Sequence, residues 1–68
     1  MTVQVSVNGE PRAVPAGTSV AQVVATVTQL ATGVAAAVNG EVMPRRSWAA
    51  ALVRDGDRIE IVTAVQGG

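Results

Sequence analysis

Residues 3–9 read Val-Gln-Val-Ser-Val-Asn-Gly, and this stretch decides how the chain begins to fold. The three valines alternate with polar residues, which is the period of a strand with one buried face. The Asn-Gly pair that follows best tolerates the positive φ angles of a two-residue type I′ turn. The stretch therefore predicts a strand that turns back on itself as a hairpin.

The return arm of this hairpin, residues 10–14, contains Pro11 and is closed by Pro15. Proline has no N–H to donate to a strand ladder, so within a sheet it is confined to edges and bulges. We therefore expect this arm to be an edge strand that is protected against pairing with other chains.

A helix is predicted after the hairpin. Ser19 and Gln22 have the spacing of a capping box, although Thr18 is a competing cap. Valines then recur at helical spacing as far as Leu30, and Gly33 is the expected stop. Because valine is a mediocre helix former, packing rather than propensity must hold this helix.

A third strand and a second turn are predicted by residues 34–38, a short apolar run that is followed by another Asn-Gly pair. The tetrapeptide Val-Asn-Gly-Glu thus occurs at residues 7–10 and again at residues 38–41. We interpret this as the same turn sequence serving two separate hairpins rather than as an internal repeat.

The last strand is predicted over residues 58–65, after the tight-turn signal Asp-Gly-Asp at residues 55–57. Its side chains alternate, so Ile59 and Ile61 are expected to point inward, and the residues between them outward. Strand, strand, helix, strand and strand in this order predict an α+β fold of the β-grasp, or ubiquitin-like, type. We expect a mixed sheet of four to five strands with one main helix packed across one face.

Residues 44–54 break the periodicity, and their structure stays open at this point. Trp48 is the only aromatic residue; it either fills the core beneath this segment or anchors a partner at the surface. Arg45 and Arg46 are expected to be solvated, with pairing to an acidic partner surface as the alternative.

Composition limits the function. The chain of 68 residues is long enough for one domain, residues 1–68. It contains no Cys, His, Lys or Tyr, so we expect no disulfide, no metal site, no bound cofactor and no self-contained enzyme. Five Arg are balanced by five acidic residues, which is not the basic footprint of a nucleic-acid binder.

The longest apolar run, residues 48–53, is far shorter than the ~20 residues of a membrane span, and no signal-peptide pattern opens the chain. We expect a cytoplasmic protein with no nucleic-acid or membrane partner.

The diglycine Gly67-Gly68 is the feature that does not serve the fold. We expect residues 66–68 to form a flexible tail beyond the last strand. A pair of glycines can occur there by chance. A tail without side chains can also thread a narrow channel and carry its carboxylate into the active site of another protein, where the carboxylate could be activated as an acyl adenylate.

Several stretches of the chain, taken together and in order, resemble the ThiS family of sulfur carriers from thiamin thiazole biosynthesis. They are Val-Asn-Gly-Glu-Val at 38–42, Pro-Arg leading to Trp-Ala at 44–49, and Asp-Gly-Asp at 55–57 leading through Ile-Glu-Ile-Val at 59–62 to the diglycine. The resemblance covers the chain from the first strand to Gly68.

This resemblance implies that an E1-like partner, ThiF, uses ATP and Mg²⁺ to adenylate the carboxylate of Gly68, with Gly67 as spacer. Sulfur relayed from a cysteine desulfurase then makes a thiocarboxylate, which the thiazole synthase ThiG consumes. The resemblance also places partner docking on the outer face of the last strand, at Val62 and Ala64, with Gln66 in the tail. The alternative for Val62 is a strand valine that packs against a loop.

Other families fit some of these features. A MoaD-like small subunit of molybdopterin synthase also ends in Gly-Gly, but is usually longer and richer in aromatic residues. A ubiquitin-type protein modifier, a TGS-type ligand-binding or RNA-binding module and a plain subunit-binding domain are the further alternatives. The sequence leaves the pathway, the sulfur donor and the oligomeric state open.

Overall fold

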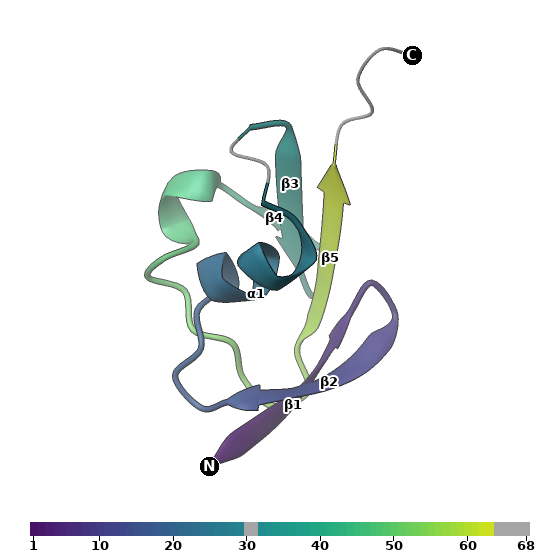
Figure 1. Cartoon of the computed structure of the whole chain (residues 1–68), viewed down its shortest axis with the longest axis vertical. Coiled ribbons are helices and arrows are strands. Elements are labelled where there is room, and N and C mark those ends of the chain that lie inside the picture. The colour runs from purple at the N-terminus through teal and green to yellow at the C-terminus, as the bar shows by residue number, and fades with distance from the viewer. Residues whose placement is uncertain (30–31, 64–68) are drawn as a thin grey trace.

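A computed structural model describes residues 1–29 and 32–63 of the chain. Within these residues one five-stranded sheet, in the order β2-β1-β5-β3-β4, is covered on one face by a helix (Figure 1). The elements in chain order are β1 (Thr2–Val7), β2 (Glu10–Pro15), α1 (Val20–Val27), β3 (Val34–Val38), β4 (Glu41–Met43), the 3₁₀ helix η1 (Arg45–Ser47) and β5 (Arg58–Thr63). The predicted β-grasp fold is confirmed.

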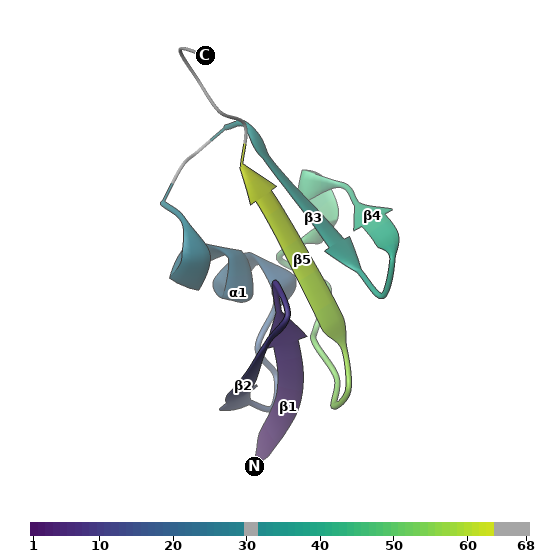
Figure 2. The same ribbon diagram turned by 90° about the vertical axis from the view of Figure 1, so that its right-hand side faces the viewer.

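The sheet is mixed because the last strand lies between the two hairpins. β5 runs parallel to β1, where Val7 pairs with Ile59, and antiparallel to β3, where Ala36 pairs with Ile61. Both hairpins are antiparallel. β2 and β3 run in the same direction and are connected through α1, which makes a crossover connection. Crossovers of this kind are right-handed, so α1 lies on one face of the sheet. The opposite face is left without a helical cover (Figure 2).

Both Asn-Gly turns have the geometry that the sequence predicts. Asn8 and Asn39 have φ angles of 51° and 53°, and the glycine after each also has a positive φ. β2, which carries the prolines, lies at a sheet edge as predicted. At these positions local backbone chemistry alone was sufficient to specify the structure.

The capping box at the start of α1 is also confirmed. The Gln22 N–H donates to Ser19 Oγ at 3.1 Å, and the Ser19 N–H donates to Gln22 Oε1 at 2.8 Å. Thr18 is not the cap, because its hydroxyl donates to the Pro15 carbonyl oxygen at 2.6 Å.

The predicted end of this helix is wrong. α1 ends at Val27, and Thr28 is already extended with φ −148°. Gly33, with φ 73°, therefore lies well beyond the helix, just before β3, and Leu30 lies outside the described residues. The β-branched pair Val27-Thr28 propagates a helix poorly, and the valines buried by α1 all lie before it.

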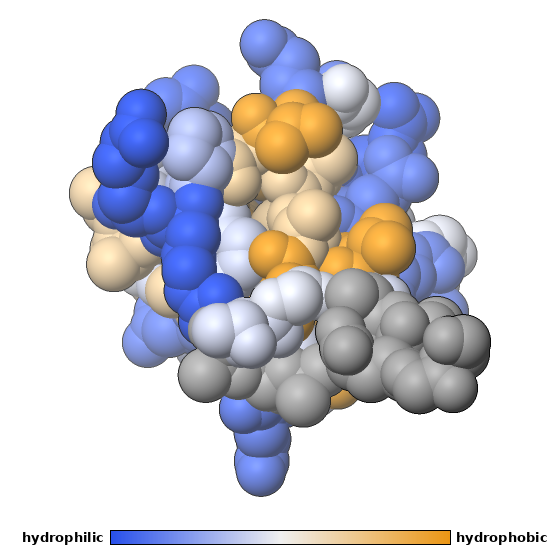
Figure 3. Space-filling model, turned by 90° about the horizontal axis from the view of Figure 1, so that it is seen from above, coloured by the Kyte–Doolittle hydropathy of each residue, from blue (hydrophilic) through white to orange (hydrophobic). Residues whose placement is uncertain are grey.

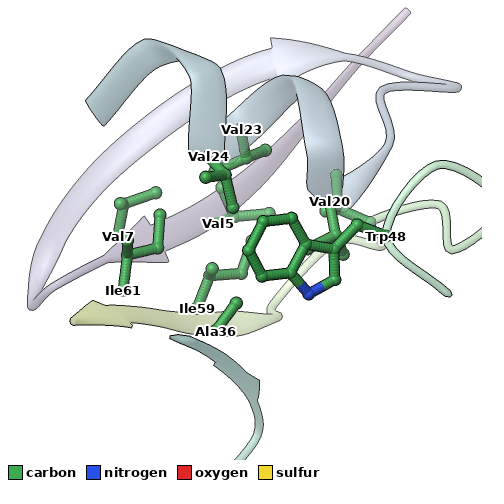
Figure 4. Packing of buried hydrophobic residues seen from close by; sticks show 10 residues of the cluster. Val5, Val7, Val20, Val23, Val24, Ala36, Trp48, Ile59 and Ile61 are labelled. Carbon is green, nitrogen blue, oxygen red and sulfur yellow. The ribbon is translucent and has the colours of Figure 1, made fainter. Parts of the chain in front are cut away.

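The core lies between α1 and the inner face of the sheet. Its buried members are Val5, Val7, Val20, Val23, Val24, Ala36, Trp48, Val53, Ile59 and Ile61 (Figure 4). Ile59 and Ile61 point inward, as predicted. None of the helices in the described part of the chain is long and apolar enough to cross a membrane.

Residues 44–54 wrap around the start of α1. Trp48 follows η1 and is 5% exposed, and its Nε1 donates to the Met43 carbonyl oxygen at 2.9 Å. Trp48 therefore fills the core. The segment is fastened to the helix start by three backbone hydrogen bonds, from the Val20 N–H to the Ala51 carbonyl, from the Ala21 N–H to the Trp48 carbonyl and from the Val53 N–H to the Thr18 carbonyl. These contacts join positions far apart in sequence, so local periodicity could not reveal them.

Candidate functional site

The candidate site begins on the outer face of β5, the face turned away from α1. Ile59 and Ile61 are 0% and 6% exposed, whereas Val62, whose side chain points to the other face, is 65% exposed. Val62 is therefore not covered by a loop, and the alternative of a packed strand valine is wrong. A large apolar side chain so exposed in a core strand is a candidate contact for another protein.

Strand register places further apolar residues beside Val62. Ala35 of β3 pairs with Val62, and Ala37 pairs both with Glu60 of β5 and with Val42 of β4. Ala35 is exposed, Ala37 is half-buried and Val42 is 77% exposed. We call Ala35, Ala37, Val42 and Val62 the outer patch; it spans the three strands that Figure 2 shows side by side.

The outer patch is bordered by charges of both signs on the same strand. Arg58 and Glu60 are exposed and point to the same face of β5 as Val62. Neither forms an ion pair with another described residue. Seen from above, apolar residues gather in the middle of the molecule with hydrophilic residues on both sides (Figure 3). An apolar centre with a polar rim is the usual composition of a protein–protein contact surface.

The two turn asparagines hold β5 in its place. Asn8 Oδ1 accepts a hydrogen bond from the Ile61 N–H at 2.7 Å, just beyond the point where β1 stops pairing with β5. Asn39 Oδ1 accepts from the Arg58 N–H at 2.9 Å, and Asn39 Nδ2 donates to Asp57 Oδ1 at 3.0 Å. Each asparagine therefore shapes a turn and also extends the hydrogen bonding of the strand that carries Val62.

Known proteins match this combination of fold and sequence. The family model of the ThiS family matches residues 5–68. The chain belongs to the ThiS family. It is 32% identical over 65 residues to the sulfur carrier protein ThiS of Escherichia coli (strain K12), a match that covers 96% of this chain and 98% of that protein.

A solved ThiS structure agrees with the family assignment. The crystal structure of the thiamine biosynthesis protein (ThiS) from Geobacter metallireducens superimposes with a TM-score of 0.75 and is 31% identical, covering 97% of this chain and 100% of that one. The resemblance inferred from sequence is therefore confirmed at the level of both family and fold.

The structure tests only part of the predicted site. Val62 lies where it was expected, on the outer face. Ala64, Gln66, Gly67 and Gly68 lie outside the described residues, as does the predicted end of β5. Their roles remain predictions from the ThiS resemblance.

Sequence reasoning missed three members of the outer patch. The run at residues 34–38 is apolar throughout, so it carries no alternation that tells its outer face from its inner face. Only pairing with β5 shows that Ala36 is buried and that Ala35 and Ala37 point outward. Val42 follows the Asn39-Gly40 turn. The geometry of a two-residue turn, combined with the register of β3 against β5, was the signal that could have placed Val42 on the outer face.

No metal centre is formed by the described residues, since no three side chains of Asp, Glu, His or Cys come together among them. The buried side-chain polar atoms in the described part of the chain all have hydrogen-bond partners. Among the described residues, the exposed outer patch is the candidate site.

Proposed function

We propose that this chain is a sulfur carrier of thiamin biosynthesis and that it holds its sulfur as a thiocarboxylate on Gly68. The observation that carries this proposal is the ThiS family match, because it runs over residues 5–68 and so includes the diglycine. The thiamin-related name of the Geobacter neighbour favours this pathway over the molybdopterin alternative.

The chemistry starts from an unreactive group, because a carboxylate is a poor electrophile. In the proposed activation an oxygen of the Gly68 carboxylate attacks the α-phosphate of ATP and pyrophosphate leaves, which gives an acyl adenylate. A sulfur nucleophile then attacks the acyl carbon and AMP leaves with the oxygen that it gained. A ThiF-like partner binds the ATP, and Mg²⁺ balances the phosphate charge there.

A donor such as a cysteine desulfurase supplies the sulfur as a persulfide, so its attack on the acyl carbon gives an acyl disulfide. A thiol reductant then cleaves the S–S bond, leaving the thiocarboxylate on Gly68 and a disulfide between the reductant and the donor. A ThiG-like thiazole synthase consumes the thiocarboxylate. The chain itself supplies no Cys, His, Lys or Tyr for these steps. We therefore assign the catalysis to the partners, and to this chain the role of a carrier that acts as their co-substrate.

We propose the outer patch as the docking site of the ThiF-like enzyme, together with Ala64 and Gln66. Gly68 is five positions beyond Thr63, where β5 ends. A fully extended chain spans at most ~3.6 Å per residue, so the carboxylate reaches no more than about 18 Å from that strand end. An enzyme that activates Gly68 must therefore contact the carrier close to the end of β5, and within residues 58–63 of that strand Val62 is the exposed apolar side chain.

The test is the conversion of Gly68. The protein is incubated with the ThiF-like partner, ATP, Mg²⁺ and a sulfur source, and the intact mass should show one oxygen replaced by one sulfur. Oxidation of Met1 or Met43 adds almost the same mass as this exchange. The product is therefore also treated with a reagent that alkylates thiols. Because the chain has no cysteine, the thiocarboxylate is its only thiol-like nucleophile, and one alkyl group should be added.

The control is a chain that lacks Gly68, which should remain unalkylated. Failure of the full chain to gain an alkylatable sulfur, with partners shown to be active on another ThiS protein, contradicts the proposed function.

A further inference from the structure

Both asparagines of the chain are followed by glycine, and this gives the turns Asn8-Gly9 and Asn39-Gly40 an intrinsic chemical weakness. Glycine has no side chain to shield its backbone nitrogen, so this nitrogen can attack the side-chain amide of the preceding asparagine with little hindrance. The attack displaces ammonia and closes a five-membered imide. Since both asparagines are exposed, each turn is a candidate site of deamidation.

The fold binds both of these side chains to β5, which lies between the two hairpins (Figure 2). Asn8 Oδ1 accepts from the Ile61 N–H, and Asn39 Oδ1 accepts from the Arg58 N–H. Rotation of either amide toward its glycine nitrogen breaks the bond to β5. The reaction therefore proceeds from a locally opened turn, and its rate depends on how firmly each amide is held.

The two amides are held differently. Asn39 Nδ2 also donates to Asp57 Oδ1 at 3.0 Å, and a hydrogen bond to a carboxylate is stronger than one between neutral groups. Asp57 is itself fixed, because its Oδ2 accepts from the Arg54 N–H at 2.8 Å. Asn8 Nδ2 has no hydrogen-bond partner among residues 1–29 and 32–63. The nitrogen that must leave is thus bound to a carboxylate in Asn39 but not in Asn8.

The position of each asparagine along β5 adds to this difference. The start of β5 is secured on both sides, since the Ser6 N–H donates to the Asp57 carbonyl oxygen at 2.9 Å and Asn39 binds from the other side. At Ile61, pairing with β1 has stopped, and among the described residues the Asn8 side chain supplies the bond on that side. A contact beyond the end of a ladder opens more easily than one within it. The bond that protects Asn8 is therefore the first of the two to open.

We propose that Asn8 is a deamidation site of the folded protein and that Asp57 protects Asn39 from the same reaction. The Gly9 nitrogen loses its proton to water and bonds to Asn8 Cγ, and Nδ2 takes up a proton and leaves as ammonia. Water then opens the imide at Cγ, which gives aspartate, or at the main-chain carbonyl carbon, which gives isoaspartate. Water is the only co-reactant, and the proposal does not depend on the carrier function.

The two products affect β5 differently. Aspartate at position 8 retains a side-chain oxygen that can accept from the Ile61 N–H. Isoaspartate carries the backbone through the former side chain, which lengthens the two-residue turn by one carbon atom and displaces the acceptor. Amide hydrogen exchange at Ile61 should therefore be faster in the isoaspartyl form than in the aspartyl form.

The test uses the arginines of the chain to separate the two sites. Trypsin cuts after arginine, so residues 1–12 contain Asn8 and residues 13–45 contain Asn39, each as the only asparagine of its peptide. The purified chain is incubated at mildly alkaline pH and digested at intervals. Mass spectrometry follows the replacement of NH₂ by OH in each peptide, and chromatography separates the aspartyl and isoaspartyl products. The same chain in urea gives the intrinsic rate of each site.

In urea the two sites should react at similar rates, because both are Asn-Gly pairs. In the folded chain Asn8 should react at least about threefold faster than Asn39, which carries the additional hydrogen bond. Asp57→Ala should accelerate Asn39 by roughly three- to tenfold, with Asn8 unchanged as the internal reference. Asp55→Ala is the matched control and should change neither rate, because this carboxylate of the same loop accepts from the Gln4 N–H and bonds to neither asparagine.

Circular dichroism melting shows that each variant is folded. Asp57→Asn leaves one acceptor oxygen and removes the charge, so it replaces Asp57→Ala if the alanine variant does not fold, and a smaller acceleration of Asn39 is expected from it. The proposal is overturned if Asn39 reacts as fast as Asn8 in the folded chain, or if Asn8 reacts only in urea. An unchanged Asn39 rate in the folded Asp57 variant, or an equal acceleration by Asp55→Ala, also overturns it.

Discussion

Replacement of Asn8 tests how the last strand is held in place. β1 pairs with β5 only as far as Val7, and Asn8 then forms two hydrogen bonds with β5: its backbone N–H donates to the Ile59 carbonyl oxygen at 2.9 Å, and its Oδ1 accepts from the Ile61 N–H at 2.7 Å. Ile61 is 6% exposed. If the acceptor is removed, this N–H is left without its partner in a largely buried position. Asn8 also has φ 51°, a region that Asn and Asp adopt more readily than other residues with a Cβ.

The two contributions can be separated by three variants. Asn8→Gly keeps the turn conformation and removes the acceptor, which should cost about 1–3 kcal/mol for an unsatisfied buried N–H. Asn8→Ala also removes the acceptor, and its Cβ has no polar group to offset the left-handed conformation, so it should cost roughly 1–2 kcal/mol more than Asn8→Gly. Asn8→Asp retains an acceptor oxygen and should change the free energy of unfolding by less than about 1 kcal/mol. A domain of this size has only about 3–10 kcal/mol to lose.

Urea unfolding monitored by circular dichroism gives these differences directly, and melting temperatures should fall by about 4–8 °C for each kcal/mol. The expected order of stability is wild type and Asn8→Asp, then Asn8→Gly, then Asn8→Ala. Amide hydrogen exchange at Ile61 should be faster in the Gly variant than in the Asp variant. An Asn8→Gly chain as stable as wild type, with unchanged exchange at Ile61, refutes the reasoning.

Three further predictions concern docking, the core and the tail. Val62→Asp should weaken binding of the ThiF-like enzyme by about tenfold with little change in stability; Leu52→Asp, at another exposed apolar residue, is the matched control, and an equal effect of both in calorimetry contradicts docking at the outer patch. Trp48→Phe should cost about 1–3 kcal/mol in urea unfolding, because it removes the hydrogen bond to the Met43 carbonyl and leaves unfilled volume; an unchanged midpoint means that the ring does not support the core. Deletion of Gly68 should leave the melting temperature unchanged while thiocarboxylate formation is lost, and a loss of folding shows instead that the residue is structural.

Much of the fold could be predicted because short stretches specify it. Each Asn-Gly pair specifies a turn through backbone conformations that few other residues tolerate, and Pro11 restricts its strand to an edge. The Ser19–Gln22 capping box marks the helix start to the residue. In these cases the deciding interaction joins residues at most three positions apart, so the local sequence is enough to predict the structure.

The features that escaped prediction depend on contacts between distant residues. The helical spacing of apolar residues continues in the sequence beyond Val27, but α1 itself ends there and buries only residues of its first two turns. Leu52 belongs to the longest apolar run and is nevertheless 57% exposed, because the backbone of that segment pairs with Ser19 and turns the leucine outward. The outer patch is the same kind of case, since Ala35 and Ala37 become its members only through the register with β5.

The dependence of the outer patch on register has a consequence for recognition. Ala35, Val42 and Val62 come from three strands, and β5, the last in sequence, must pair with β3 before they lie on one surface. A diglycine on an unfolded chain or on a fragment has no such surface beside it. An enzyme that docks on the outer patch therefore selects folded carriers, and ATP is not spent on chains that cannot deliver their sulfur. The two turn asparagines fasten β5 where both hairpins meet it, so under the proposed docking at the outer patch they contribute to this selection.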